Sequence, residues 1–281
     1  MNNKFICGRY VLDLSSPLVM GIVNVTPDSF SDGGPQSEQL DLAIEHGLSM
    51  VKAGAQILDI GGESTRPGSD AVSLQEELRR VLPVIEGLRE AGVPLSIDTL
   101  KPQVMQAALD TGADMINDIY ALRQPGALEV VAKHPNCGIC MMHMAGEPKT
   151  MQQSPPDYGG NITDAVKQFL HERVDVLLQY KVESARIMLD PGFGFGKTVA
   201  QNYQLLNELA DLKSLNLPLL IGLSRKSMIG AVTGKEPKDR LIGSVVAAMA
   251  CADRGAAVLR VHDVVETVEA LAVWRAINQG E

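Results

Sequence analysis

Residues 53–60 read AGAQILDI, which joins a helix stop to a short apolar run with an acidic residue near its end. Glycine is the usual residue just past the C-terminus of a helix. The same arrangement returns at 111–113 (TGA) and at 254–256 (RGA), each time between a helical pattern and an apolar run. This repeat predicts alternating helices and strands, the pattern of an α/β protein.

Eight short apolar runs are predicted to be strands, and several are apolar at consecutive positions, as in parallel strands that are buried on both faces. They are Leu18–Val25, Gln56–Ile60, Pro94–Ile97, Asp114–Ile119, Gly138–Met142, Arg186–Leu189, Pro218–Leu223 and Ala256–Val261. Eight such units predict a (β/α)₈ TIM barrel, with a doubly wound open sheet as the alternative. We expect a single domain over residues 1–281, in which the N-terminal segment 1–14 contains a short β-hairpin at the bottom of the barrel.

The composition is that of a folded protein: 281 residues, 45% hydrophobic and 21% charged. Because 25 Lys and Arg residues stand against 34 Asp and Glu residues, the net charge is −9, which argues against binding to nucleic acid or to an anionic membrane. No apolar run approaches the ~18 residues of a membrane span, and the N-terminus lacks the apolar core of a secretory signal. Four cysteines are too few for a disulfide scaffold, so we predict a cytoplasmic protein with reduced thiols.

Polar side chains follow the predicted strands, where a barrel builds its active site. They are Asn24, Asp59, Glu63, Asp98, Asn117, Asp118, His143, Asp190, the segment Ser224–Ser227, Arg260, His262 and Asp263. An Asp or Asn side chain near the end of an apolar strand lowers stability if it is buried without a hydrogen-bond or charge partner, so these positions are candidates for a ligand site. Arg225, Lys226, Arg260 and His262 follow the last two strands, where barrels commonly hold a phosphate. The pattern predicts a ligand with a donor-rich head and an anionic tail; a purely structural ion-pair network is the alternative.

Two segments resemble known functional motifs, but we do not expect them to have the functions of those motifs. Residues 192–198 (GFGFGKT) resemble a P-loop but are one residue short, so we expect a flexible loop that presents Phe193 or Phe195 to a ligand. Cys137 and Cys140 form a CxxC pattern inside a predicted strand, where they would be buried and inert. His143 has two open interpretations, a ligand or base and a structural hydrogen-bonding residue.

Five segments in order resemble the signatures of bacterial dihydropteroate synthases. They are residues 21–34 (GIVNVTPDSFSDGG), 61–68 (GGESTRPG), 189–197 (LDPGFGFGK), 224–227 (SRKS) and 260–263 (RVHD). The resemblance covers nearly the whole chain. It implies a TIM barrel, usually a homodimer, that joins p-aminobenzoate to 6-hydroxymethyl-7,8-dihydropterin diphosphate, giving 7,8-dihydropteroate and pyrophosphate for folate biosynthesis.

The resemblance also implies a role for each matching residue. Asp98, Asn117, Asp190, Lys226 and Arg260 would hold the pterin, and Asn24, Arg66, Arg260 and His262 would hold the diphosphate. Asn24 would place Mg²⁺, the implied cofactor. Phe30, Thr65, Pro67, Phe195 and Ser227 would border p-aminobenzoate. We assign the catalytic work to Asn24, Arg66, Lys226, Arg260 and His262.

The expected chemistry is SN1-like, because the reacting methylene adjoins an electron-rich ring and departure of the diphosphate leaves a delocalised cation. Such a path needs stabilisation of the leaving group and exclusion of water rather than a protein nucleophile. Sulfonamides that mimic p-aminobenzoate are expected to compete. The alternatives are a folate-binding methyltransferase barrel, a non-catalytic pterin-binding relative and an aldolase-type phosphate-binding barrel.

Overall fold

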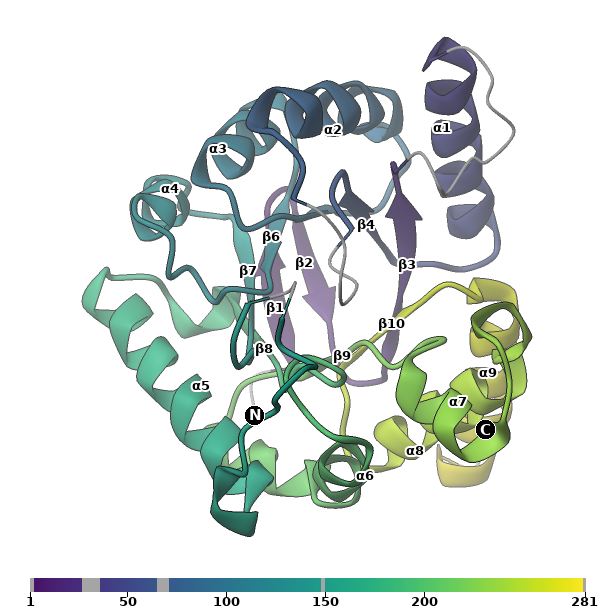
Figure 1. Ribbon diagram of the computed structural model, residues 1–281. Helices are drawn as coiled ribbons and strands as arrows, with labels where there is room; N and C mark the ends of the chain where they lie inside the picture. The colour runs from purple at the N-terminus through teal and green to yellow at the C-terminus, as the bar shows by residue number, and fades with distance from the viewer. Residues whose placement is uncertain (1–2, 27–35, 65–70, 148–149, 280–281) are drawn as a thin grey trace.

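The computed structural model describes residues 3–26, 36–64, 71–147 and 150–279. An eight-stranded parallel sheet lies inside a ring of helices (Figure 1). Its strands are β3 (Leu18–Asn24), β4 (Ile57–Gly61), β5 (Leu95–Asp98), β6 (Met115–Asp118), β7 (Gly138–Met142), β8 (Ile187–Asp190), β9 (Leu220–Ile221) and β10 (Val258–Val261). Neighbouring strands follow the order β8-β7-β6-β5-β4-β3-β10-β9, and a parallel bridge between Leu189 and Leu219 completes the ring.

The helices alternate with the strands along the chain. They are α1 (Gln36–Lys52), α2 (Leu74–Leu88), α3 (Pro102–Thr111), α4 (Ala127–Lys133), α5 (Ile162–Gln179), α6 (Val199–Asn207), α7 (Ser227–Thr233), α8 (Leu241–Asp253) and α9 (Val264–Gln279). Short 3₁₀ turns occupy Tyr158–Gly160, Ser184–Arg186, Leu209–Leu215 and Pro237–Asp239. The predicted TIM barrel is therefore confirmed. None of the helices in the described ranges has the length and hydropathy that crossing a bilayer requires.

The predicted N-terminal hairpin is present as β1 (Lys4–Cys7) and β2 (Tyr10–Asp13), an antiparallel pair. Phe5 and Cys7 are buried against inward-facing side chains near the N-terminal ends of the barrel strands, among them Met20, Met115 and Met188. The hairpin therefore closes the barrel bottom, and this apolar layer is the floor of the barrel interior.

The seventh strand is shorter than predicted. Residues 218–223 are apolar, but only Leu220 and Ile221 pair as a strand, with Val258 and Leu259 of β10. Beyond Leu223 the chain turns sharply, and Arg225 adopts a left-handed backbone conformation with φ of 60°. Apolar character marks burial of the whole segment, whereas pairing is limited to the part that stays straight.

Candidate active site

The carboxyl ends of the barrel strands place four polar or small residues side by side. In the strand register Asn24 is opposite Gly61, Gly61 is opposite Asp98, and Asp98 is opposite Asn117. Three of these four residues were predicted site residues. Four others, Phe30, Thr65, Arg66 and Pro67, lie outside the described residues.

A chain of ion pairs and hydrogen bonds crosses the barrel interior just inside this rim. Arg260 of β10 donates from Nε to Asp59 Oδ2 (2.6 Å) and from Nη2 to Asp98 Oδ2 (2.8 Å). Asn117 donates from Nδ2 to the same Asp59 oxygen (3.1 Å). The structure thus brings Asp98, Asn117 and Arg260 together, with Asp59 at the centre of the contact.

The electrostatics of this cluster follow from its burial. Burial raises the pKa of Asp98 to about 7, although the Arg260 guanidinium opposes the rise. Burial alone would lower the pKa of Arg260, but the charges of Asp59 and Asp98 outweigh it and raise that pKa above its ordinary value. Arg260 therefore stays charged, whereas Asp98 can take up a proton near neutral pH.

Three buried polar atoms of this region have no hydrogen-bond partner within the described part of the chain: Asp59 Oδ1, Asp98 Oδ1 and Ser96 Oγ. Asp59 and Ser96 are opposite each other in the register of β4 and β5. Buried polar groups without a partner are rare and costly, and they are characteristic of sites that receive a ligand or solvent.

Asp190 and Lys226 form the opposite, more positive side of the site. Asp190 Oδ1 accepts a hydrogen bond from the backbone N–H of Gly192 (2.7 Å), and burial raises the Asp190 pKa against the effect of Lys226. Lys226 donates to the backbone carbonyl of Phe193, and its ammonium lies 4.5 Å from the ring centroid of Phe195. Burial lowers the pKa of Lys226 to about 8, while Asp190 opposes the shift.

The structure corrects one part of the prediction for the loop 192–198, namely that Phe193 could be presented to a ligand. Phe193 is fully buried in the main core rather than offered to a ligand. The buried Lys197 donates to the backbone carbonyls of Gly192 (2.7 Å) and Phe195 (3.2 Å). Unlike a P-loop lysine, Lys197 binds its own loop, and it thereby fixes the two phenylalanines next to Lys226.

The loop geometry requires glycine where a side chain would collide with the neighbouring backbone, most severely at Gly192. Gly192 has φ of 70°, and a Cβ there would lie 1.9 Å from the His143 carbonyl oxygen. His143 Nδ1 is 2.9 Å from Lys197 Nζ, and its ring packs edge-on against Phe169 at 5.0 Å. Burial, aided by Lys197, lowers the His143 pKa to about 2. His143 is therefore a neutral acceptor within the loop support, which favours the structural interpretation.

The cations after β9 and β10 are not equivalent. Arg225 pairs with the carboxylate of Asp263, so it is not a free anion-binding group as its position suggested. His262 Nδ1 lies 3.0 Å from Ser224 Oγ, a contact that joins the two loops. Ser227 is the first residue of α7, directly after Lys226.

The cysteine prediction is confirmed, since Cys7, Cys137, Cys140 and Cys251 are all buried and unpaired. Burial raises the pKa of the Cys137 thiol to about 12, and that of Cys140 also rises above its ordinary value. Neither thiol is poised for redox chemistry.

The sequence placed Asp59 among the polar residues at the strand ends but gave it no role, and it did not single out Ser96 or the contacts of Lys197. Asp59 and Ser96 are polar residues inside otherwise apolar strands, which was the available signal. Lys197 lies in the segment that resembles a P-loop, but the sequence does not show which backbone atoms its ammonium contacts, because these depend on how the loop folds.

The comparisons with known proteins agree with this geometry. Residues 20–262 match the model of the pterin binding enzyme family. The chain is 49% identical over 266 residues to the dihydropteroate synthase of Escherichia coli (strain K12), covering 94% of this chain and 93% of that protein. The chain belongs to the dihydropteroate synthases. These enzymes are transferases of the pterin-binding family.

Solved structures give the same result. The Yersinia pestis dihydropteroate synthase, in a sulfonamide drug complex, superposes with a TM-score of 0.92 at 48% identity, covering 98% of this chain and 99% of that one. The Burkholderia cenocepacia enzyme, complexed with 7,8-dihydropteroate, gives a TM-score of 0.90 at 50% identity, covering 99% and 97%. At this identity the likeness extends beyond the barrel, a fold that many unrelated enzymes share.

Proposed function

We propose that this chain joins p-aminobenzoate to 6-hydroxymethyl-7,8-dihydropterin diphosphate, forming 7,8-dihydropteroate and releasing pyrophosphate. The observation that supports it most is the buried acceptor cluster at the strand ends, where Asp98, beside Arg260, keeps one oxygen without a partner among the described residues. A pterin edge carries amino and ring N–H donors, so it complements such acceptors.

The pterin would be held from two sides. Arg260 contacts Asp98 directly and shares one Asp59 oxygen with Asn117, and Asp190 with Lys226 faces them from β8 and the loop after β9. Asp190 accepts ligand N–H groups, and Lys226 donates to a ring carbonyl or nitrogen. Asp98, with a pKa of about 7, is a group whose charge adjusts to the bound ligand near neutral pH.

The reaction would proceed by departure of the diphosphate and capture of the resulting cation. The bond between the pterin methylene and the diphosphate oxygen breaks, and its electron pair leaves with pyrophosphate. The neutral aromatic amine then adds to the methylene carbon and loses a proton to solvent. Arg260 and His262, together with Arg66 from the loop outside the described residues, would stabilise the departing charge.

Magnesium is the implied cofactor, and the donor chemistry of the site suits it. No cluster of three or more His, Cys, Asp or Glu side chains capable of holding a metal occurs among the described residues. Mg²⁺ commonly uses one or two protein oxygens, substrate phosphates and water. The half-buried carboxamide of Asn24 offers one such oxygen at the end of β3. When bound, the ion would neutralise charge on the diphosphate.

The p-aminobenzoate site would lie beside Lys226. Phe195 is already packed under the Lys226 ammonium, and Ser227 follows in the sequence. Phe30, Thr65 and Pro67 would complete this site from loops outside the described residues. Its occupant would thus meet the methylene carbon at the mouth of the pterin pocket.

Assembly as a homodimer belongs to the same proposal. Ile242 on α8 and Ile277 on α9 are 78% and 76% exposed, and Val246 and Val273 on the same helices are also exposed. An apolar face of this kind fits a second copy of the chain better than water.

The four unpaired cysteines support a cytoplasmic location.

A coupled pyrophosphate assay tests the function. Release is expected only when both substrates and Mg²⁺ are present, and sulfonamides are expected to compete with p-aminobenzoate. Undiminished release without p-aminobenzoate, or after rigorous chelation, would contradict the reaction or the metal role respectively. A methyl-transfer assay with methyltetrahydrofolate separates the methyltransferase alternative.

A further inference from the structure

Asp59 occupies a position that the proposed pterin contacts do not explain. Its side chain is fully buried in the barrel interior, on β4, and is surrounded by strand-end residues rather than solvent. One of its oxygens, Oδ2, accepts hydrogen bonds from both Asn117 and Arg260, while Oδ1 has no partner in the described ranges. A buried charge that is incompletely paired destabilises a fold, so its retention calls for a different reason.

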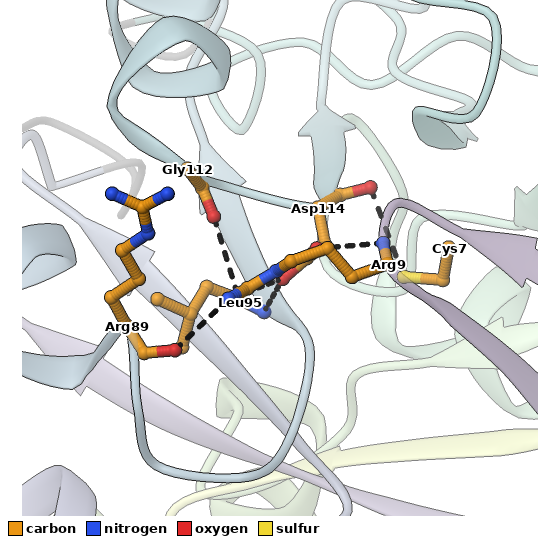
Figure 2. Close-up of polar contacts among 6 residues, drawn as sticks. All are labelled: Cys7, Arg9, Arg89, Leu95, Gly112 and Asp114. Carbon is orange, nitrogen blue, oxygen red and sulfur yellow. Dashed lines mark hydrogen bonds and ion pairs between the residues drawn. The ribbon is translucent and has the colours of Figure 1, made fainter.

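The contrast with Asp114 shows what a purely structural carboxylate looks like in the same barrel. Asp114 is also buried and is also paired with an arginine, Arg9 of the hairpin turn (Figure 2). Its Oδ1 accepts from the backbone N–H and the Nε of Arg9, and its Oδ2 accepts from Arg9 Nη2 and from the Leu95 N–H. Each carboxylate oxygen of Asp114 therefore accepts two hydrogen bonds, so neither buried acceptor is left unsatisfied.

Asp59 instead determines what its neighbours can offer a ligand. A carboxylate only accepts hydrogen bonds, so the Asn117 carboxamide must turn its Nδ2 toward Asp59. The carbonyl oxygen of Asn117 is then directed away from Asp59. Without this constraint the two ends of the carboxamide could exchange places, because they are nearly equal in shape.

The same carboxylate holds the Arg260 guanidinium. Arg260 is clamped between Asp59 at Nε and Asp98 at Nη2, so its plane is fixed by two charged contacts. One side chain of β4 therefore sets the orientation of two groups that come from opposite directions around the barrel, β6 and β10.

We propose that Asp59 is a positioning residue, which makes Asn117 an acceptor toward the pterin and fixes the Arg260 guanidinium beside it. This inference rests on the proposed function. It assigns Asp59 no contact with the reacting atoms.

The test compares the affinity for 6-hydroxymethylpterin, measured by calorimetry, between the wild-type chain and the Asp59→Asn variant. The variant should bind about 10-fold or more weakly, because a neutral amide no longer holds Arg260 by a charged contact and, since it can donate as well as accept, no longer forces Asn117 to present its Nδ2. The KM for p-aminobenzoate should stay within about twofold, a split that general loosening of the fold does not produce. In the Asn117→Ala background, Asp59→Asn should cost much less than in the wild type, since part of its effect acts through Asn117.

The matched control is Asp114→Asn, the same substitution in a buried arginine-paired carboxylate at the other end of the barrel. It should leave pterin affinity unchanged. If Asp59→Asn does not fold, Asp59→Ser is measured against the same criteria. Unchanged pterin affinity in the folded variant, or full additivity with Asn117→Ala, would overturn the positioning role. Absence of pterin binding by the wild type would instead overturn the proposed function.

Discussion

The two ends of the barrel each bury acidic side chains against an arginine, yet they use them differently. At the bottom, Arg9 of the hairpin contacts Asp114, whose two oxygens accept four hydrogen bonds (Figure 2). At the top, Arg260 contacts Asp59 and Asp98, and each of these keeps one oxygen without a partner among the residues that the structure describes. Complete pairing marks the end that holds the fold, and incomplete pairing marks the end that receives a ligand.

Single strands connect these two ends. Asp114 immediately precedes β6, and Asn117 lies three residues later, roughly 10 Å along the strand. Leu95, whose N–H binds Asp114, begins β5, and Asp98 ends it. The hairpin turn packs closely against Asp114. Gly8 has φ of 60°, and a Cβ there would lie 2.3 Å from Asp114 Oδ1. The Arg9–Asp114 contact thus holds the ends of these strands that lie away from the site.

The largest expected effect at the top is that of Asp190→Asn. The Gly192 N–H requires an acceptor, so the amide oxygen of the new side chain would face Gly192 and its NH₂ group would face the pterin donors. We expect pterin affinity to fall about 100-fold, the loss of charged hydrogen bonds in a buried site. Calorimetry with 6-hydroxymethylpterin measures it; unchanged affinity with an unchanged melting temperature would contradict the assignment of Asp190.

At the bottom, Asp114→Asn is expected to lower the free energy of unfolding by about 1–3 kcal/mol. An amide cannot accept all four hydrogen bonds, although Arg9, 40% exposed, can return to solvent. Urea denaturation measures the change, and calorimetry should give wild-type pterin affinity. A loss of pterin affinity without a loss of stability would break the division between the two ends.

Much of this division could be predicted from the sequence, for a physical reason. Strands buried on both faces are apolar at consecutive positions, so the barrel was evident, and polar residues at strand ends such as Asp98 and Asp190 revealed the rim. Pairing was not predictable. Arg225 and Arg260 looked alike as cations after adjacent strands, but Arg225 is neutralised by Asp263 while Arg260 reaches across the barrel to Asp59. Such contacts depend on where separate strands meet in space.

The contact between Arg9 and Asp114 could be predicted from the sequence even less well. Arg9 and Asp114 are separated by 105 residues, and neither belongs to a recognisable motif. The hairpin itself was predicted, but its anchoring residue was not, since one exposed-looking arginine in a turn resembles any other. Likewise, Asp59 and Asp98 are both acidic residues near strand ends, and only their register shows that Asp59 lies one layer deeper.

A pH titration of pterin binding sharpens the description of the top of the barrel. Lys226 has a pKa of about 8, lowered by burial and by Arg260 and raised by Asp190 and Asp98. Its charged form donates to the ligand, so the favourable contribution is fully present well below pH 8 and is lost progressively as the pH rises through about 8. We expect affinity about 10-fold lower at pH 9 than at its plateau, measured by calorimetry. In Lys226→Arg, whose guanidinium keeps its charge, the decrease above pH 8 should be absent; persistence of the decrease would exclude Lys226 as its source.

The smallest expected effect concerns Ser96, whose hydroxyl is one of three buried polar side-chain atoms that have no partner among the described residues. Removing its hydroxyl in Ser96→Ala should leave the free energy of unfolding unchanged or raise it by up to about 1 kcal/mol, because nothing in the described chain bonds to it. Thr99→Val is the matched control on the same side of the barrel: Thr99 Oγ1 donates to Glu77 Oε1 (2.6 Å) and accepts from the Lys101 N–H (3.2 Å). That variant should lose about 1–3 kcal/mol in urea denaturation. If Ser96→Ala instead loses as much as Thr99→Val, the hydroxyl has a strong partner in the free protein, and incomplete pairing no longer distinguishes the top of the barrel from its base.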